Sequence, residues 1–258
     1  MRGPGTGRVL WARDADPAIG YHGQAAWLRL PDGVVGLAPP GAPLGPRWIQ
    51  RAEPWPSLTE GDPVTVDSDG LHASDGALFL ESRQAVGWLG PLPDPTQLSG
   101  AAARALISDA LSSCKRSSLL DPPWHTKVKQ AASAIGRLPP LDALTIVAGA
   151  LGGLGPGLTP AGDDMLSGIL FAVRAMNGPM VEPALLDVAR SVRTSDLATA
   201  LLEAAAGGYQ IEPVHDLVTA GATGDTKAAA RAAADLDRFG SSSGADIAHG
   251  LRLAFTRQ

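Results

Sequence analysis

Cysteine is nearly absent from this chain of 258 residues, because Cys114 is the only one. A single cysteine excludes an internal disulfide and a cysteine-based metal site, and it favours a reducing compartment. Lys115 and Arg116 follow it directly, a setting that lowers the pKa of a thiol. A small residue that packs between helices is the simpler interpretation of Cys114.

Excess basic charge and long apolar runs are lacking as well. The formal net charge is −5 and the 21 lysines and arginines are scattered, which argues against nucleic acid as a partner. The longest apolar stretch, "ALTIVAGALGGLG", is too short and too rich in glycine to span a bilayer. The N-terminal "MRGPGTGRVLWARD" has no apolar core of a signal peptide. We therefore expect a cytoplasmic protein that binds neither nucleic acid nor membrane.

The two parts of the chain follow different patterns, which predicts an α+β fold. Residues 1–95 hold short apolar runs around Asp-Gly pairs, the signal of hairpins, and predict a small antiparallel β domain, barrel-like or sandwich-like. Residues 91–100, "PLPDPTQLSG", are typical of a linker, and residues 96–258 predict an all-α domain. Helices are expected at about 100–118, 124–136, 141–151, 163–177, 183–193, 196–206, 213–220, 225–238 and 245–256.

The stretch "GGLGPGLTPAGDD", residues 152–164, is the main candidate for a binding site. A glycine loop that runs into a helix presents free N–H groups and a partial positive charge, which suit a phosphate or a carboxylate. We expect Gly155, Gly157, Thr159 and Gly162 to contact a small anionic metabolite. No lysine follows the last glycine, so the spacing is not that of a P-loop.

Asp163 and Asp164 would repel an anion at this place, and two explanations remain open. In the first, they cap free N–H groups, with Asp163 at or near the N-cap. In the second, at least one binds Mg²⁺, whose charge offsets the repulsion and bridges to the anion.

A second segment, "SSSGADIAHGLRLAF" at residues 241–255, repeats the Gly-x-Asp-x-x-x-Gly spacing of the first. We predict that both helix starts face a common cleft, with Asp164 and Asp246 as a candidate metal pair and Ser243 and Gly244 as substrate contacts. The alternative is that both helices are merely capped and that their glycines permit close packing. The corresponding residues are Gly162, Asp164 and Gly168 in the first segment and Gly244, Asp246 and Gly250 in the second.

Other polar residues are weaker candidates. Thr194 and Ser195 stand at an expected helix start, where capping and ligand contact are both open. His215 is a candidate general acid or base, and His22, between glycines at a strand edge, is a candidate substrate contact. The chain has no H-E-x-x-H, and its single G-x-S-x-G, at residues 240–244, follows an expected helix and not a strand, so we identify no clear nucleophile for covalent catalysis.

Together these segments resemble the AllH-like family, named for a subunit of oxamate carbamoyltransferase. The resemblance rests on "GLGPGLTPAGDDMLSG" at residues 153–168, and the β half matches only loosely around His22. Further support comes from "TSDLATALLEAA" (194–205), "EPVHDLV" (212–218) and "SSGADIAHG" (242–250).

The resemblance implies a carbamoyltransferase built from several different subunits. Such an enzyme interconverts oxalurate plus phosphate with oxamate plus carbamoyl phosphate in allantoin degradation, a part of purine catabolism. It implies that N–H groups and Thr159 hold an oxyanion, while Asp163 or Asp164 holds a metal or orients an amide. Two other functions stay open: a non-catalytic structural subunit, and a stand-alone hydrolase that holds Mg²⁺ with Asp164 and Asp246.

Overall fold

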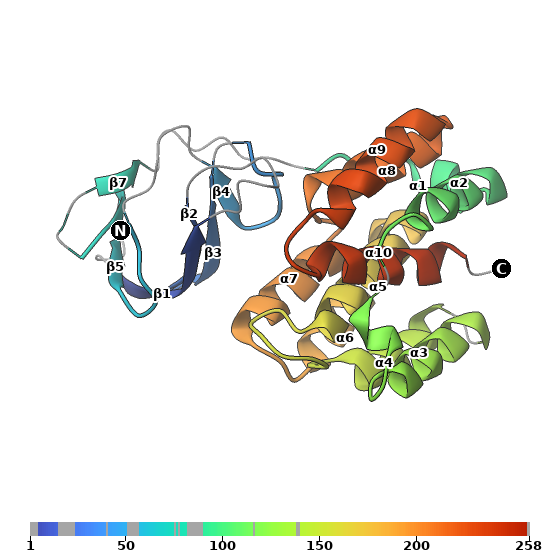
Figure 1. The fold of residues 1–258 in the computed structure, drawn as a ribbon, viewed down its shortest axis with the longest axis horizontal. Coiled ribbons are helices and arrows are strands. Elements are labelled where there is room, and N and C mark those ends of the chain that lie inside the picture. Colours follow the sequence, from blue (N-terminus) through green and yellow to red (C-terminus); the bar gives the residue numbers. More distant parts are fainter. Residues whose placement is uncertain are drawn as a thin grey trace. The chain divides into compact units, whose positions relative to one another are not determined.

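The computed structural model describes residues 5–14, 24–39, 41–50, 57–74, 76, 78–81, 90–115, 117–137 and 140–256. The chain divides into two compact units, residues 1–89 and residues 90–258. The first unit is a β-sheet and the second is helical, so the predicted α+β class is confirmed (Figure 1).

The first unit contains one mixed sheet of seven strands in the order β4-β3-β2-β1-β5-β6-β7. All neighbouring strands pair antiparallel except β3 and β4, which pair parallel. The sheet curls into a half-barrel, which corresponds to the barrel-like form among the two predicted (Figure 1). The strands are β1 (Gly5–Asp14), β2 (Gln24–Leu30), β3 (Gly33–Ala38), β4 (Trp48–Gln50), β5 (Pro63–Val66), β6 (Gly70–His72) and β7 (Leu78–Glu81).

Asp-Gly pairs form the predicted hairpin turns of this sheet. Leu30 pairs with Gly33 across the β2–β3 turn, and Val66 pairs with Leu71 across the β5–β6 turn. Gly33 has φ 137° and Gly70 has φ 152°, backbone conformations that a side chain disfavours. The buried core of this unit includes Val9, Ala26, Leu28, Leu37, Leu58, Val64 and Leu71.

The second unit contains the helices that alanine and leucine periodicity predicts, and one that it misses. α1 (Pro95–Ser99) lies inside the predicted linker, where Asp94 and Gln97 form a capping box. The expected first long helix ends at Leu111 rather than 118, because the chain turns at 112–114. The longer helices are α2 (Ala101–Leu111), α3 (His125–Arg137), α4 (Pro140–Leu151), α5 (Ala161–Asn177), α6 (Glu182–Ser191), α7 (Asp196–Ala206), α8 (Glu212–Thr223), α9 (Thr226–Asp237) and α10 (Ser243–Phe255); the short η3 (Ser118–Leu120) and η4 (Pro179–Val181) are 3-10 turns.

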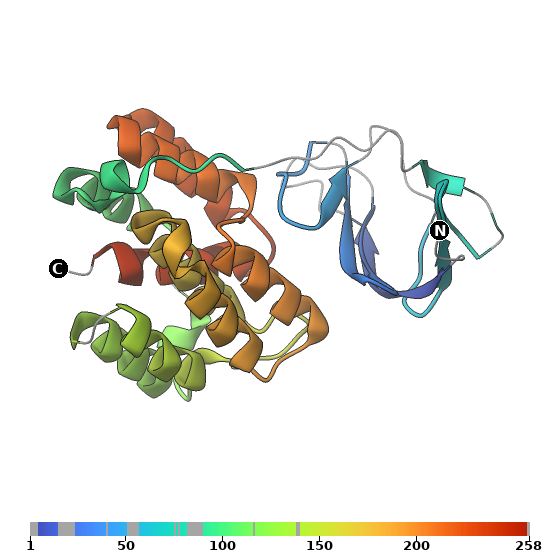
Figure 2. The same cartoon turned by 180° about the vertical axis from the view of Figure 1, so that it is seen from behind.

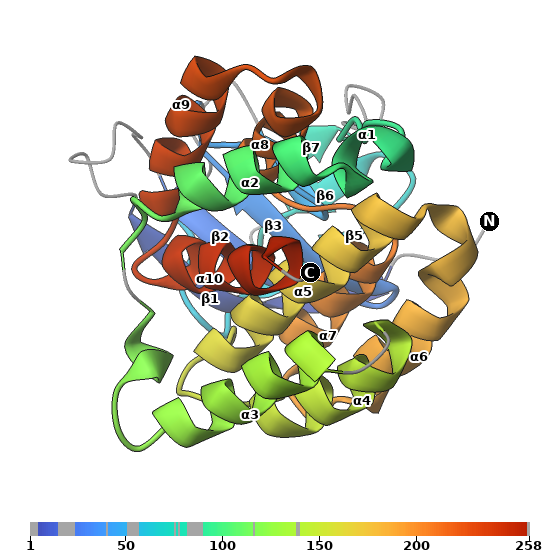
Figure 3. The same cartoon turned by 90° about the vertical axis from the view of Figure 1, so that its right-hand side faces the viewer.

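α5 and α10 cross at the centre of the helical unit. α2, α8 and α9 lie on one side of this pair, and α3 and α4 lie on the other (Figure 3). α6 and α7 pack together beside α5, as the view from behind shows (Figure 2). α5 is therefore buried along most of its length, from Gly162 to Ala175.

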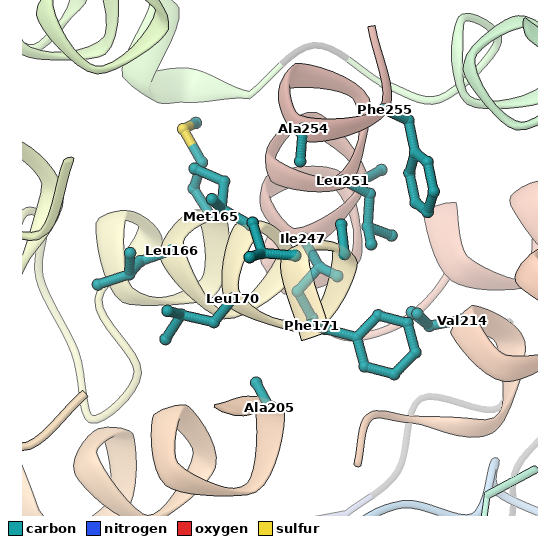
Figure 4. Close-up of a cluster of buried hydrophobic side chains, with 14 of the residues drawn as sticks. Met165, Leu166, Leu170, Phe171, Ala205, Val214, Ile247, Leu251, Ala254 and Phe255 are labelled. Atoms are coloured by element: carbon teal, nitrogen blue, oxygen red, sulfur yellow. The ribbon is translucent and has the colours of Figure 1, made fainter. Parts of the chain in front are cut away.

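The crossing of α5 and α10 is packed with apolar side chains, including Met165, Phe171, Ile247 and Leu251 (Figure 4). Burial of side chains of this size stabilises the unit by about 1.5–3 kcal/mol each. Within the described part of the chain, no helix combines the length and apolarity needed to cross a membrane.

Candidate functional site

Glycines let α5 and α10 approach to backbone contact at their crossing. A Cβ added to Gly168 would lie 2.4 Å from the Ile247 carbonyl oxygen, and one added to Gly250 would lie 1.9 Å from the Met165 carbonyl oxygen. The contact is reciprocal, because the glycine of each helix meets the first turn of the other. Met165 directly follows Asp164, and Ile247 directly follows Asp246. The repeated spacing thus describes two helix starts that pack against each other, as the packing alternative for these glycines predicted.

The first glycine of each segment also meets a backbone oxygen. A Cβ on Gly162 would lie 2.0 Å from the Leu151 carbonyl oxygen, and one on Gly244 would lie 1.8 Å from that of Leu236. Leu151 ends α4 and Leu236 lies in the last turn of α9, so each glycine packs its helix start against the end of the helix before it. Gly162 and Gly244 are both predicted substrate contacts. Close helix packing alone already requires glycine at these two positions.

The loop between α4 and α5, residues 152–160, needs glycine for its backbone. Gly153, Gly155 and Gly157 have φ of 68°, 110° and 99°, all in the region that side chains disfavour. Gly157 is exposed, and nothing lies within 4 Å of the place where its Cβ would be. The glycines therefore both shape the loop and leave its outer surface open.

Several N–H groups at the start of α5 already have backbone partners. The Gly162 N–H donates to the Leu154 carbonyl oxygen at 2.8 Å, and the Asp163 N–H donates to that of Pro160 at 2.8 Å. Pro160, the N-cap residue, makes no side-chain cap. An anion bound here would therefore depend on the outer part of the loop, where Gly155, Gly157 and Thr159 lie, more than on the first turn of the helix.

Asp163 ties the loop to the start of α7. It is 2% exposed, and its Oδ1 accepts a hydrogen bond of 2.8 Å from the Gly153 N–H while its Oδ2 accepts a short one from the Thr194 hydroxyl. Burial raises the pKa of Asp163, and these two hydrogen bonds work against that rise. Asp163 therefore holds the loop in place. It does not cap its own helix, as the first of the two explanations above supposed.

Ser195 holds the other end of the loop. Its hydroxyl donates to the Leu158 carbonyl oxygen at 2.5 Å and accepts from the Ala198 N–H at 3.0 Å, so that it caps α7. The hydroxyls of Thr194 and Ser195 are thus already used inside the protein, and their predicted contact with substrate stays a prediction.

Asp164 and Asp246 are buried near each other, without full hydrogen bonding. They are 7% and 0% exposed, and among the described residues the Oδ2 of each has no hydrogen-bond partner. Burial raises the pKa of Asp164 well above its usual range, the Ser243 hydroxyl lowers it, and the charges of Asp246 and Asp163 raise it further. The predicted common cleft and metal stay predictions, since no group of three or more metal-ligating residues occurs in the described parts of the chain.

Ser117 is a hydrogen-bond partner of this pair that the sequence did not indicate. It is 1% exposed, and its hydroxyl donates a short hydrogen bond to Asp246 Oδ1. Burial raises the pKa of Asp246, while the hydroxyls of Ser117 and Ser242 lower it. Oxygen atoms from two helix starts and from the residue before η3 are therefore close to one another.

The comparisons with known proteins point to the same part of the chain. Residues 151–255 match the model of the family described as "Oxamate carbamoyltransferase subunit AllH". This part of the chain, called the AllH-like region below, is similar to that family. The matched segment runs from the end of α4 to the end of α10, and so contains the glycine loop, Asp163, Asp164 and Asp246. No curated protein and no solved structure matches the chain.

His215 lies inside the AllH-like region as a buried, neutral ring. Its Nε2 accepts from the Gln210 N–H at 3.1 Å, so its Nδ1 carries the proton and donates to the Pro91 carbonyl oxygen at 2.9 Å. Burial lowers the pKa of His215, and the hydrogen bond to the Pro91 carbonyl oxygen works against that change. An acid–base role would require one of these bonds to break, so the catalytic assignment of His215 stays a prediction.

Two other candidates fall outside residues 151–255 of the sequence. His22 falls outside the described residues, and its predicted contact with substrate stays a prediction. Cys114 packs against the backbone of α9, with Sγ 3.5 Å from the Ala233 carbonyl oxygen, and burial raises its pKa to about 11. The thiol is therefore unreactive, in agreement with the simpler interpretation.

Proposed function

We propose that the chain is a subunit of a carbamoyltransferase that acts on small acids. The substrates would be oxamate with carbamoyl phosphate, or oxalurate with phosphate in the reverse direction. The observation that carries the proposal is the match of residues 151–255 to the oxamate carbamoyltransferase subunit model. Other subunits of the same assembly are the expected protein partners.

The outer surface of the glycine loop is the proposed place for the anionic end of a substrate. Gly155 and Thr159 are half-buried and Gly157 is exposed, so the backbone N–H groups and the hydroxyl can reach a ligand. Arg193 lies beside the loop, because its carbonyl oxygen is 2.8 Å from where a Cβ of Gly153 would be. Its exposed guanidinium supplies the positive charge that an anion requires.

Carbamoyl transfer suits a site that positions substrates without a protein nucleophile. The nitrogen of oxamate attacks the carbamoyl carbon of carbamoyl phosphate, phosphate leaves with the electrons of the broken C–O bond, and the nitrogen loses a proton. Orientation of two small molecules and stabilisation of the developing oxyanion lower the barrier of such a step. In this proposal the loop and Arg193 orient the acid, and the Asp164 region lies on the inner side of the same helix start.

Thermal melts of the full chain with single ligands test the proposal. Phosphate, carbamoyl phosphate, oxamate and oxalurate are added separately to wild type, Arg193→Gln and Thr159→Ala. A ligand at about 100 times its Kd should stabilise the chain by about 2.7 kcal/mol, and we expect both variants to lose that gain. Arg231→Gln, which changes an exposed arginine on α9, is the matched control and should keep it.

The alternative of a non-catalytic structural subunit is favoured by one specific observation. Asp163, Thr194 and Ser195 use their polar atoms to hold the loop, as a purely architectural junction would. The absence of a melting shift with all four ligands would contradict substrate binding and favour this alternative. An equal shift in Arg193→Gln and wild type would place the anion elsewhere.

A further inference from the structure

We propose that Asp164 and Asp246 bind a divalent cation of the Mg²⁺ class between the first turns of α5 and α10. The inference rests on the unsatisfied atoms of these two side chains and not on the proposed function. It concerns the inner side of the helix starts, whereas the proposed anion site concerns the outer loop.

The two carboxylates converge because of the reciprocal glycine crossing. Asp164 lies four residues before Gly168 and Asp246 lies four residues before Gly250, so each carboxylate shares a helix face with the glycine at the contact. The backbone approach at both glycines brings the first turns of the two helices together. Two buried acidic side chains from distant parts of the sequence thus meet in one place.

Each carboxylate keeps one oxygen atom without a partner. Asp164 Oδ2 and Asp246 Oδ2 are buried and accept no hydrogen bond from the described residues, although the two side chains are 7% and 0% exposed. A buried polar atom without a partner costs about 1–3 kcal/mol, and more where it is charged. A cation in contact with both Oδ2 atoms would remove this cost at both side chains at once.

Burial raises the pKa of both carboxyl groups, but two features of their surroundings stabilise the charged form that binds a cation. Both residues lie in the first turn of a helix, where the partial positive charge of the N-terminus stabilises an anion. Ser117 donates its hydroxyl to Asp246 Oδ1, and no lysine or arginine forms an ion pair with Asp164 or Asp246 within the described ranges. Two negative charges that no described lysine or arginine neutralises match one divalent cation.

The type of donor atom indicates the class of metal. Carboxylate oxygens are the protein ligands preferred by Mg²⁺, Mn²⁺ and Ca²⁺, and Mg²⁺ is commonly held by one or two carboxylates with water completing the shell. No cysteine or histidine is part of the cluster formed by Ser117, Asp164, Ser243 and Asp246. The site therefore suits a hard cation and not zinc.

Asp163 provides an internal contrast to the proposed ligands. It is adjacent to Asp164 and buried to a similar extent, yet both of its oxygens accept hydrogen bonds from Gly153 and Thr194. Its charge is used by the protein itself. Asp163→Asn is consequently the matched control for a test of Asp164 and Asp246.

The test measures Mn²⁺ and Mg²⁺ binding to the full chain without any anionic ligand. Mn²⁺ is titrated and the free ion is followed by electron paramagnetic resonance, and thermal melts compare Mg²⁺ with EDTA. We expect one Mn²⁺ per chain and a rise in Tm of about 5 °C at 100 times the Kd. Asp164→Asn and Asp246→Asn should lose the binding and the shift, whereas Asp163→Asn should keep both.

Ser117→Ala makes the test independent of the folding of the aspartate variants. It keeps both carboxylates and removes only the hydroxyl that orients Asp246, so Mn²⁺ binding should weaken about 10-fold or more. Absence of binding by wild type at millimolar Mg²⁺ and Mn²⁺ would overturn the inference. So would unchanged binding in Asp164→Asn or Ser117→Ala. Because this test contains no anionic ligand, neither result bears on the proposed carbamoyltransferase function, which the melts with anions test separately.

Discussion

The starts of α5 and α10 share a sequence spacing but differ in what their connecting loops require. Each has a glycine against the preceding helix, a buried aspartate in the first turn and a glycine at the crossing. Where α5 has a second acidic residue, Asp163, α10 has Ala245. The shared features build the helix crossing, and the difference lies at the entry to the helix.

The loop lengths explain this difference. The loop into α5 covers residues 152–160, whereas the one into α10 covers only residues 238–242. A longer loop loses more conformational freedom when it becomes ordered, so it needs additional bonds to hold it. Asp163 supplies two of them. Asp163 and Asp164 are therefore neighbours with separate roles, one for the loop and one for the helix pair.

The largest expected effect comes from disrupting the close glycine crossing that the two helix starts share. Gly250→Ala places a Cβ 1.9 Å from the Met165 carbonyl oxygen, so α5 and α10 must separate. We expect a loss of about 3 kcal/mol or more in the free energy of unfolding, measured by urea denaturation followed by circular dichroism.

Gly149→Ala on α4 is the control for that experiment. Nothing lies within 4 Å of its Cβ position and the residue is exposed, so alanine should stabilise the helix by about 0.5–1 kcal/mol. A Gly250→Ala protein as stable as wild type would show that the close crossing is not required.

The second largest expected effect is a difference in stability between variants of the two neighbouring aspartates. Asp163→Asn replaces an acceptor of two hydrogen bonds by an amide that can satisfy only one of them, with an expected cost of about 1–3 kcal/mol. Asp164→Asn should cost less in EDTA, because its Oδ2 has no partner to lose among the described residues. Denaturation curves of both variants in EDTA measure the difference, and equal losses would contradict the separate roles.

A smaller effect is expected from the glycines in the two loops. Gly155 has φ 110° and Gly240 has φ 63°, and only the second value lies near the left-handed helical region that other residues adopt. Gly155→Ala should cost about 2 kcal/mol and Gly240→Ala about 1 kcal/mol. Equal melting temperatures of the two variants would indicate that the α5 loop relaxes without strain.

The smallest expected effect comes from a ring contact in a later turn of α5 that has no counterpart on α10 among the described residues. Phe171 of α5 packs edge-on against the ring of His215, which is buried and has a lowered pKa. A histidine with a lower pKa in the folded state stabilises fully above its unfolded pKa of about 6.5, and this stability is lost as the pH falls.

We therefore expect the free energy of unfolding to decrease by on the order of 1 kcal/mol as the pH falls below about 6.5. Urea titrations at pH 8 and pH 5.5 measure it. His215→Asn should lower the stability at pH 8 but show a weaker dependence on pH. An identical pH dependence in wild type and variant would assign the effect to other groups.

The helices were largely predictable, because alanine and leucine repeat at helical spacing along the second unit. α1 was missed because Pro95 and the preceding residues are also typical of a linker, although Asp94 and Gln97 carry a capping-box signal. The hairpins at Asp32-Gly33 and Asp69-Gly70 were predicted from the turn alone. The parallel pairing of β3 with β4 was not, since it joins strands that no tight turn connects.

The candidate site was predictable only in part. The repeated spacing placed Asp164 and Asp246 together as a hypothesis, and the structure brings them close. Ser117 was missed because it lies 129 residues from Asp246 and shares no motif with it. The role of Asp163 was missed for the same reason, since Thr194 is 31 residues away.

Local sequence by itself determined the helices, the turns, and the glycines and aspartates at the two helix starts. These features depend on backbone conformation and on periodicity within a few residues, which the sequence contains directly. Only the tertiary structure decided which polar atoms have hydrogen-bond partners. Asp163 accepts hydrogen bonds from Gly153 and Thr194, while Asp164 and Asp246 each keep one oxygen without a partner within the described parts of the chain. Hydrogen bonds and burial depend on residues that are distant in sequence, and folding alone brings those together.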